Sequence, residues 1–563
     1  MRILLAALVA LSMLMQQPAG DRPAGNTRGT RSVVMARNGA IATSQPLATA
    51  AGLKVLQDGG NAIDAAVTAA AVLSVVEPTM NGPGGDLFAI VYSAKDHKVH
   101  GLNASGRAPA AATLDEFKKR NLQHVPLRGE LSVSVPGVVD GWNELLTKHG
   151  TRTLAQALEP AIRYARDGYA VSEIIAGQWK EVENLLSRDA KTAAVFLPGG
   201  KAPAPGDVFK NPALASSLEQ IAKGGRDVFY KGAIAKAIAD DMQRRNGLLT
   251  AKDLADHHAD WVEPLSTTYR GYQVLELPPN TQGVTALEML NILEGFDLKS
   301  LGHNTAAYLH VMVEAKKIAF ADRGAWIGDP SSTPPKAIER MLSKDYAAER
   351  RKEINPDKAS EYKALTLTGT AAPPADPEPA GRGDTIYMTA ADSQGNVISL
   401  IQSLYETFGS GIVAGDTGIV LHDRANLFSL TPGHPNQIAP GKRPFHTLVP
   451  AMVMKDGAPW LSFGVMGGDM QAQGHAQVLA NLIDFGMNVQ EAGEAPRFRH
   501  SGNGLALESA FTADARNGLT ARGHHVTGGT GAWGGFQGIL IDPKTRVLMA
   551  GSDPRKDGMA AGW

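Results

Sequence analysis

Two segments that alternate between apolar and polar residues, joined by a polar turn, give the clearest pattern in the chain. In the first segment, residues 386–391, Ile386, Met388 and Ala390 alternate with Tyr387, Thr389 and Ala391. In the second segment, beyond the turn 392–396, one face carries Val397, Ser399, Ile401, Ser403 and Tyr405. A period of two is typical of β-strands, and the turn predicts that the two strands form a hairpin.

The turn also predicts how the two strands pair. A hairpin folded about Gln394 pairs residues whose numbers add up to about 788. This register sets Ser403 opposite Thr385, with Cβ atoms about 5 Å apart. A second hydroxyl is therefore expected beside the residue that begins the first strand.

The N-terminal part predicts a strand, two helices, a loop and two more strands. We expect a strand at Gly39–Thr43, a helix at Pro46–Gln57 and a second helix with Ile63, Ala66, Val67 and Ala70 on one face. The glycine-rich loop Asn81–Gly85 precedes strands at Leu87–Tyr92 and Val99–Ala104. Both helices are rich in small residues, so we expect them to pack closely.

The remaining chain is predicted to change from helices to strands. Residues 110 to about 370 are expected to be mainly helical, with apolar faces at Leu154–Asp167, Leu214–Ala222, Ile234–Arg244, Ala286–Leu293 and Ala306–Phe320. After the hairpin, strands are expected at Gly418–His422, Ala451–Lys455, Trp460–Val465 and Phe536–Ile541. A helix is expected to follow Gly467 and Gly468. The sequence thus predicts an α/β fold.

The junction before the hairpin suggests that the chain cuts itself. The tract 371–380 is rich in Pro, Ala and acidic residues without an apolar period, so we expect it to be disordered. A cut between Asp384 and Thr385 would give Thr385 a free α-amine beside its own hydroxyl. An α-amine with a pKa of roughly 7.7–8.0 is suited to take the hydroxyl proton. The alternative is that Thr385 serves only β propensity.

The first 20 residues and the composition indicate export. Residues 1–20 combine Arg2, an apolar run to Met15 and a small-residue end, which is typical of a secretory signal peptide. We expect a periplasmic or secreted protein without a membrane span. The formal net charge of -1 argues against nucleic acid or anionic membranes as partners. Because the chain has no cysteine, disulfides and thiolate chemistry are excluded.

Two further patterns suggest binding sites. Gly467 and Gly468 lie between a strand and a helix, where successive N–H groups can hold an anion; a tight turn is the alternative. Arg107 follows a strand and could hold an anionic group of a substrate. His257 and His258 are adjacent and point apart, so no metal is predicted there.

Short matching pieces in the same order connect the chain with a known family. They are Ser44–Ala48, Gly59–Ala66, Val76–Pro78, Val135–Gly137, Tyr269–Tyr272, Ala321–Arg323, Gly328–Pro330, Phe408–Val413 and Gly467–Gly468. From about Gly39 to Trp563 the chain resembles the gamma-glutamyltransferases, which are N-terminal-nucleophile hydrolases with an αββα sandwich. The resemblance implies that residues 21–384 form a large subunit and residues 385–563 a small one, held together as a heterodimer in one αββα unit.

The resemblance also assigns the catalytic centre. It places the nucleophile at Thr385, a second hydroxyl at Ser403 and the oxyanion-binding pair at Gly467 and Gly468. No metal or cofactor is implied. The catalytic residues of the family are thus all matched.

The substrate pocket departs from the family pattern. Glutamate-specific members bind the α-carboxylate through an Arg that aligns with Ser105, while Arg107 stands two places later. The family Asn becomes Tyr405, the family Gln becomes Arg424, and the Asp that receives the substrate ammonium aligns with Leu427 beside Asn426. The Ser-Ser pair of the family becomes His446 and Thr447. The candidate substrate-binding residues of this chain are therefore Arg107, Tyr405, Arg424, Asn426, His446 and Thr447.

These departures point to an acylase-like member of the family. Losing charged hydrogen bonds worth about 1.5–3 kcal/mol disfavours γ-glutamyl substrates by about one to two decades. We expect a self-processing amidohydrolase or acyltransferase that cleaves γ-glutamyl or glutaryl-like amides through an acyl-enzyme, as in the related cephalosporin acylases. Two alternatives stay open: a glutathione hydrolase or transpeptidase with a rebuilt α-amine site, and a non-catalytic exported binding protein.

Overall fold

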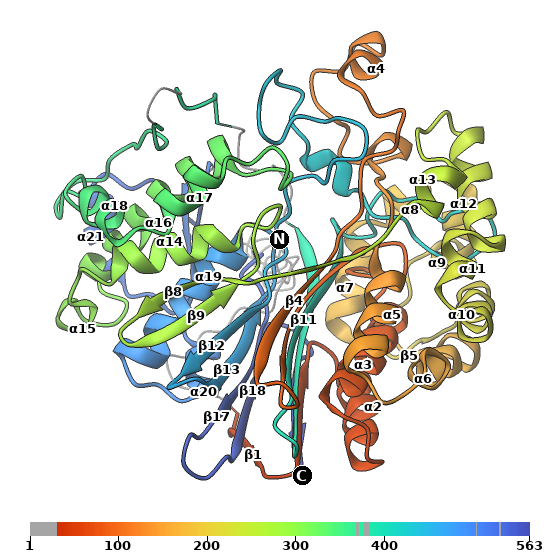
Figure 1. Cartoon of the computed structure of the whole chain (residues 1–563), viewed down its shortest axis with the longest axis horizontal. Helices are drawn as coiled ribbons and strands as arrows, with labels where there is room; N and C mark the ends of the chain where they lie inside the picture. The colour runs from red at the N-terminus through yellow and green to blue at the C-terminus, as the bar shows by residue number, and fades with distance from the viewer. Residues whose placement is uncertain (1–30, 368–370, 376–382, 503, 529–530) are drawn as a thin grey trace, which may run out of the picture.

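Two seven-stranded antiparallel sheets lie face to face at the centre of the molecule, and helices cover the outer side of each (Figure 1). The structure is a computed structural model that describes residues 31–367, 371–375, 383–502, 504–528 and 531–563, with only the backbone of Asp384. The predicted signal sequence and residues 376–380 of the Pro/Ala tract lie outside the described residues. The predicted αββα sandwich is confirmed.

The first sheet contains the hairpin predicted around Thr385. Its strands, in spatial order, are β19 (Met559–Gly562), β2 (Gly39–Thr43), β10 (Asp384–Asp392), β11 (Val397–Tyr405), β3 (Asp86–Ser93), β4 (Lys98–Ala104) and β7 (Asp260–Val262). The hairpin strands β10 and β11 thus lie between β2 and β3, inside the sheet.

The second sheet carries the glycine pair at one strand end. Its strands, in spatial order, are β1 (Val34–Ala36), β18 (Leu548–Ser552), β17 (Phe536–Ile541), β13 (Ala458–Val465), β12 (Ala451–Lys455), β9 (Tyr272–Glu276) and β8 (Leu265–Tyr269). Two small sheets lie apart: β14 (Phe498–Ser501), β15 (Gly504–Leu507) and β16 (Val526–Gly528), and β5 (Tyr169–Ala170) with β6 (Val208–Phe209).

Each sheet has its own helical layer. The first sheet packs on α2 (Pro46–Gln57), α3 (Ala62–Val76) and α5 (Val138–His149), with α6 (Leu154–Asp167) and α10 (Pro212–Gly224) farther out. The second packs on α14 (Gly283–Leu293), α19 (Met470–Leu479) and α20 (Val489–Glu494), with α16 (Ala306–Trp326) and α21 (Ala513–Ala521) outside them. Every residue of α3 is buried, which its small side chains permit, and Asn61 and Asp64 form a capping box at its start.

The remaining helices complete the two outer layers and the loops. They are α4 (Leu114–Lys119), α7 (Glu173–Glu181), α8 (Glu183–Leu186), α9 (Ala190–Phe196), α11 (Arg226–Tyr230), α12 (Ala233–Arg244), α13 (Ala251–Ala255), α15 (Leu298–Leu301), α17 (Pro335–Met341) and α18 (Lys344–Arg351). A short 3-10 helix, η3 (Arg424–Leu427), follows the hairpin.

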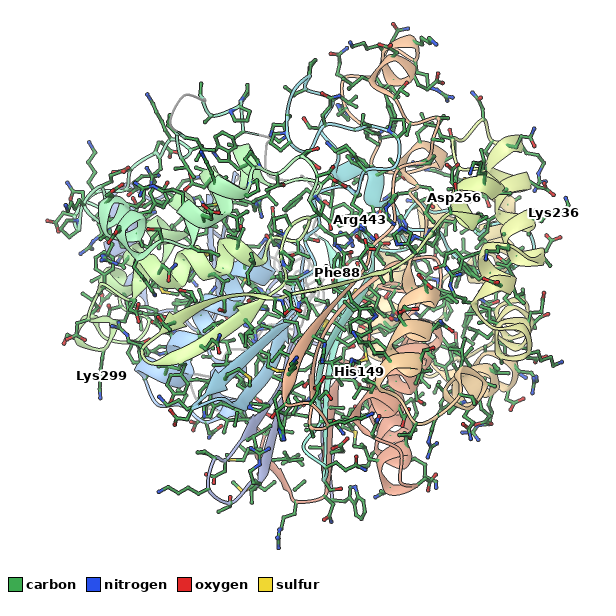
Figure 2. All side chains as sticks on the ribbon, viewed as in Figure 1. Phe88, His149, Lys236, Asp256, Lys299 and Arg443 are labelled. Carbon is green, nitrogen blue, oxygen red and sulfur yellow. The ribbon has the colours of Figure 1, made fainter. Side chains whose placement is uncertain are left out.

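The alternation predicted for β10 separates two cores. Ile386 and Met388 pack into the core under α3, whereas Tyr387 lies in the layer between the two sheets. Figure 2 shows Phe88, another residue of that central layer, near the middle of the molecule, while Lys299 lies at the periphery. One strand thus serves two hydrophobic layers, as a period of two requires.

One of the predicted strands is absent. Gly418–His422 forms only single bridges, because Gly418 has φ +68° and the N–H of His422 bonds to the Gly84 carbonyl instead of a strand ladder. Residues 110–370 are mainly helical, as predicted, although the short strands β5 to β9 also lie there. The turn between β8 and β9 is Arg270–Gly271, both with positive φ, and Arg gives little sequence signal for such a turn.

Candidate active site

Thr385 is the second residue of β10 and lies beside a bulge in the neighbouring strand. From Ile386 to Ala391 the pairs with β11 follow the predicted register, but Asp384 pairs with Tyr405, so β11 has one extra residue opposite Thr385. Thr385 is 2% exposed and faces the Ser403–Leu404 segment. The direct pairing predicted for Thr385 and Ser403 is therefore replaced by a bulge, in which Ser403 and Leu404 together lie opposite Thr385.

The bulge results from the conformation of Tyr405. This residue has φ +82°, which is unusual for a residue with a side chain, and its N–H donates to the Ser403 hydroxyl over 2.6 Å. The hydroxyl of Ser403 therefore holds the bend in β11 that lies against the start of β10.

The chain before Thr385 lies against the glycine pair. Gly383 has φ +64°, and a Cβ placed on it would lie 2.6 Å from the Gly468 Cα, so a glycine is required there. Its N–H donates to Glu406 Oε1 over 2.8 Å. The predicted cleavage junction is thus held between Glu406 and the turn of Gly467 and Gly468.

The glycine pair forms the tight turn between β13 and α19. Both residues have positive φ, +108° for Gly467 and +58° for Gly468, and their carbonyls accept from the N–H groups of Met470 and Gln471. Both readings predicted from the sequence, a tight turn and an anion-binding turn at a helix start, are compatible with this geometry.

Three side chains fix this turn, and the sequence did not identify them as site residues. Gln282 donates to the Gly468 carbonyl over 3.2 Å and to the Thr447 carbonyl over 2.7 Å. Arg323 donates to Gln282 and to Asp469, each over 2.7 Å. Gln282, Arg323 and Asp469 come from three separate helical segments, so the sequence gives no signal that they meet at the glycine turn.

A buried cluster of charged residues adjoins the bulge. The Arg424 guanidinium lies over the Tyr405 ring, 4.6 Å from its centroid, and donates to the Thr447 hydroxyl over 3.0 Å. Its Nε is 3.9 Å from Asp86, which pairs with Ser403 across β3 and β11. Predicted binding residues from distant segments thus meet beside Thr385.

His446 belongs to the same cluster and holds Asp86. Its Nε2 is 3.1 Å from Asp86 Oδ2, and its ring packs edge-on against Phe88. Burial, together with the charge of Arg424, lowers the pKa of His446 to about 3, so the ring is neutral and Nε2–H donates to the carboxylate. Burial opposes the charge on Asp86, but His422, His446 and Arg424 together hold its pKa below the usual range.

Two Arg424 donors have no acceptor. Within the described residues, Nε and Nη2 of Arg424 make no hydrogen bond, although the side chain is completely buried. A buried charged donor without an acceptor is costly, on the order of 1–3 kcal/mol or more. This place in the cluster therefore suits an anionic or carbonyl oxygen from outside the chain.

Beyond Tyr405, two acidic residues share one arginine. Arg128 lies 3.8 Å from Glu406 and 3.7 Å from Asp423, and the N–H of Glu406 donates to Asp423 over 3.1 Å. Burial, only partly offset by Arg128, raises the pKa of Asp423 to about 7. Asp423 therefore changes charge near neutral pH, directly before the predicted binding residue Arg424 in the chain.

This raised pKa predicts a pH-dependent stability. Above the unfolded pKa near 3.8, the folded state keeps a proton on Asp423 that the unfolded state has released, so stability falls as the pH rises towards about 7. Asp423→Asn removes this dependence of stability on pH. We therefore expect the melting temperature of Thr385→Ala/Asp423→Asn protein, relative to that of uncut Thr385→Ala protein, to rise between pH 4 and pH 8. The exposed Asp416→Asn serves as control, and an equal effect at both pH values would contradict the assignment.

Two predicted binding residues make contacts outside this cluster. Arg107 donates to Asp260 over 2.9 Å and to the His258 carbonyl over 3.0 Å. Asn426 donates to the Val125 carbonyl over 2.7 Å. In the uncut chain both side chains are thus engaged elsewhere, and their roles in binding stay predictions.

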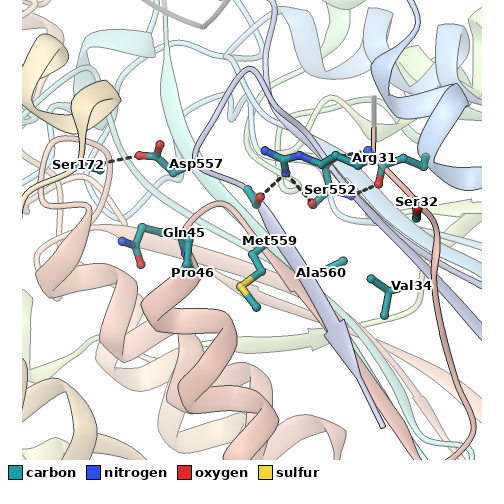
Figure 3. A pocket seen from close by; sticks show the side chains of 12 residues that line it. Arg31, Ser32, Val34, Gln45, Pro46, Ser172, Ser552, Asp557, Met559 and Ala560 are labelled. Atoms are coloured by element: carbon teal, nitrogen blue, oxygen red, sulfur yellow. Dashed lines mark hydrogen bonds between the residues drawn. The ribbon is translucent and has the colours of Figure 1, made fainter. Parts of the chain in front are cut away.

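A cavity of about 420 Å³ lies away from the candidate site. It is bordered by Arg31, Gln45, Ser172, Ser552 and Met559 among others, and none of the predicted site residues lines it (Figure 3). Arg31 and Asp557 close two of its sides through hydrogen bonds to Ser552 and Ser172. This cavity is therefore separate from the cluster around Arg424 and Asp86.

Comparison with known proteins agrees with this geometry. The sequence profile described as gamma-glutamyltranspeptidase matches residues 48–563. The chain belongs to the gamma-glutamyltranspeptidase family. The family resemblance predicted from short motifs is therefore confirmed over most of the chain.

Three similar proteins illustrate the range of this family. The glutathione hydrolase-like YwrD proenzyme of Bacillus subtilis (strain 168) is 40% identical over 92% of this chain and 97% of its own length. The acylase ACY 1 proenzyme of Pseudomonas sp. (strain SE83) is 37% identical over 90% of each chain. The crystal structure of cephalosporin acylase from Bacillus halodurans superposes with a TM-score of 0.88 at 42% identity, covering 95% of this chain and 97% of that one.

Membership in the gamma-glutamyltranspeptidase family fixes the class of activity. The chain is an enzyme, a self-processing amidohydrolase or acyltransferase, and its proenzyme relatives imply processing into two subunits. This outcome does not support the non-catalytic binding protein. Within the described residues, no helix has the length and apolar character needed to cross a membrane.

Proposed function

We propose that this family member cuts itself between Asp384 and Thr385 and then uses Thr385 as an N-terminal nucleophile. Residues 21–384 and 385–563 would form the two subunits. The position of Thr385 at the start of a buried strand, next to Ser403 and the junction held against Gly468, supports this assignment. The predicted signal sequence supports action in the periplasm or outside the cell.

In the first step, the uncut chain reacts with itself. The Thr385 hydroxyl attacks the Asp384 carbonyl carbon, the peptide C–N bond breaks, and the resulting ester is hydrolysed by water. The left-handed turn at Gly383 and its bond to Glu406 hold the junction in one geometry. Glu406 is therefore a positioning residue for processing.

In each later cycle, the new α-amine of Thr385 is the base. It takes the hydroxyl proton as Oγ attacks the substrate amide carbonyl, and it gives the proton to the leaving amine. N–H groups of the Gly467–Gly468 turn stabilise the oxyanion, and Gln282 and Asp469 fix that turn. Water then hydrolyses the acyl ester, or an amine accepts the acyl group.

The proposal for the substrate rests on the two hydrogen-bond donors of Arg424 that have no acceptor among the described residues. A carboxylate or carbonyl at the far end of the acyl group would accept from Nε and Nη2, which lack acceptors among the described residues. The family's contacts to an α-amine are replaced, so the acyl group needs no amine. A glutaryl-type amide fits both conditions.

A panel of acyl p-nitroanilides tests this substrate class. We expect kcat/KM for glutaryl-p-nitroanilide to exceed that for γ-glutamyl-p-nitroanilide by about 10- to 100-fold, since each lost charged hydrogen bond is worth about 1.5–3 kcal/mol. Pentanoyl-p-nitroanilide, which has the same length without the carboxylate, is the matched control. A clear preference for the γ-glutamyl compound would remove the proposal.

One observation favours a second candidate, a glutathione hydrolase or transpeptidase. Asp423 Oδ2 has no hydrogen-bond partner among the described residues and lies 3.7 Å from Arg128. A substrate ammonium at this oxygen would replace the family Asp. In that case the γ-glutamyl compound would be the preferred member of the panel, and Asp423→Asn would remove the preference.

A further inference from the structure

Three buried side chains far along the chain from the catalytic residues meet with metal-ligand chemistry. His310 and Glu314 lie one turn apart on α16, and His524 lies just beyond α21. One ligand atom from each residue lies within 4.8 Å of the others, and His524 Nε2 is 4.0 Å from Glu314 Oε1. All three residues are nearly inaccessible to solvent.

Hydrogen bonds already orient the two α16 residues as ligands. His310 Nε2–H donates to the Asn355 carbonyl over 2.7 Å, which leaves the lone pair of Nδ1 directed at the cluster. Glu314 Oε2 accepts from the Tyr362 hydroxyl over 2.6 Å and from the Ser360 N–H over 2.9 Å. Metal-ligating histidines and carboxylates typically have such outer partners.

The two imidazoles are hydrogen-bonded to each other within the cluster. Since His310 Nε2–H donates to Asn355, His310 Nδ1 accepts from His524 Nε2–H over 2.7 Å. A metal ion between the two rings would take the place of this proton, with His524 then protonated on Nδ1. Neutral imidazole and carboxylate are common ligands of zinc.

A cation already approaches the carboxylate. Lys317 Nζ lies 2.7 Å from Glu314 Oε1, while its side chain is 10% exposed. Lys316 Nζ lies 3.3 Å from His500 Nδ1, and Arg522 adds a positive charge near His310 and His524. The ammonium of Lys317 would have to move towards solvent when a divalent ion takes its place, so Lys317 competes with the metal.

We propose that His310, Glu314 and His524 form a zinc site, with a water as the remaining ligand. His310 and Glu314 precede Thr385 and His524 follows it, so the ion would join the large subunit to the small one. This joining role rests on the proposed cut at Thr385, whereas zinc binding itself does not. The sequence predicted no metal because His524 is separated from the α16 pair by about 200 residues.

Zinc titration of the chelator-treated, full-length enzyme tests the site. We expect one zinc per chain and a rise in melting temperature on zinc addition. His524→Ala should weaken binding by about 100-fold or more, and Tyr362→Phe, which keeps all three ligands, by about 10-fold. Lys317→Gln should tighten binding, a response that a purely structural hydrogen-bond cluster would not give.

His303→Ala is the matched control, because His303 is a partly buried histidine that bonds to Asn481 outside the cluster. It should bind zinc as the unchanged enzyme does. No zinc uptake and no melting shift in the unchanged enzyme would overturn the site, as would equal uptake by His524→Ala. Running the same titration on uncut Thr385→Ala protein separates the two proposals, since zinc binding should persist there whether or not Thr385 is the cut site.

Discussion

Replacing Thr385 by alanine should leave a single uncut chain with no detectable turnover of acyl anilides. The change removes the hydroxyl that would attack both the Asp384 carbonyl and the substrate, and without the cut no free α-amine is available as base. Turnover should fall by on the order of 10⁴-fold or more. Denaturing electrophoresis and a p-nitroanilide assay measure the two effects.

Thr385→Ser is the matched control for this change. It keeps the hydroxyl and, after cutting, the α-amine, so we expect processing to continue and turnover to stay within about 100-fold of the unchanged enzyme. N-terminal sequencing of the smaller fragment should begin at residue 385. A fragment that begins elsewhere, or a Thr385→Ala chain that still divides, would disprove the assignment.

Arg424→Met should lower activity on substrates that carry a carboxylate at the far end of the acyl group and spare substrates that lack it. The change keeps much of the side-chain volume over the Tyr405 ring but removes the two donors that lack acceptors. We expect kcat/KM for glutaryl-p-nitroanilide to fall about 10- to 100-fold and that for pentanoyl-p-nitroanilide to change little. Initial rates with both compounds measure the effect.

The control must exclude damage to the fold, because Asp86 loses a charged neighbour in this variant. Complete processing of Arg424→Met into two fragments would show that the junction still forms. Arg424→Lys keeps the charge but not the planar donors, so an intermediate loss is expected. Equal losses for both anilides would show that Arg424 supports the structure and not the substrate.

Local patterns predicted the parts of the site that lie on regular elements. The alternation on both sides of Gln394 was sufficient for the hairpin and for its register from Ile386 onwards. The one-residue shift beside Thr385 was not predictable, because it depends on the positive φ of Tyr405, a residue type that rarely adopts this conformation.

Long-range contacts account for what the sequence did not predict. Asp86, Gln282 and Arg323 reach the site from segments about 60 to 300 residues away from Thr385, and no spacing rule connects them with it. Conversely, Arg107 follows a strand as predicted, but Asp260 from β7 draws its guanidinium away. Partners supplied by tertiary packing decide where a charged side chain points.

The strand order has a consequence for how this protein can be made. β2, which precedes the proposed cut, lies between β10 and β19, which follow it, and β9 continues the second sheet from β12. Neither subunit contains all the strands of either sheet, so the cut must come after the whole polypeptide has folded. Two halves expressed from separate genes would each expose unpaired strand edges, and such edges promote aggregation.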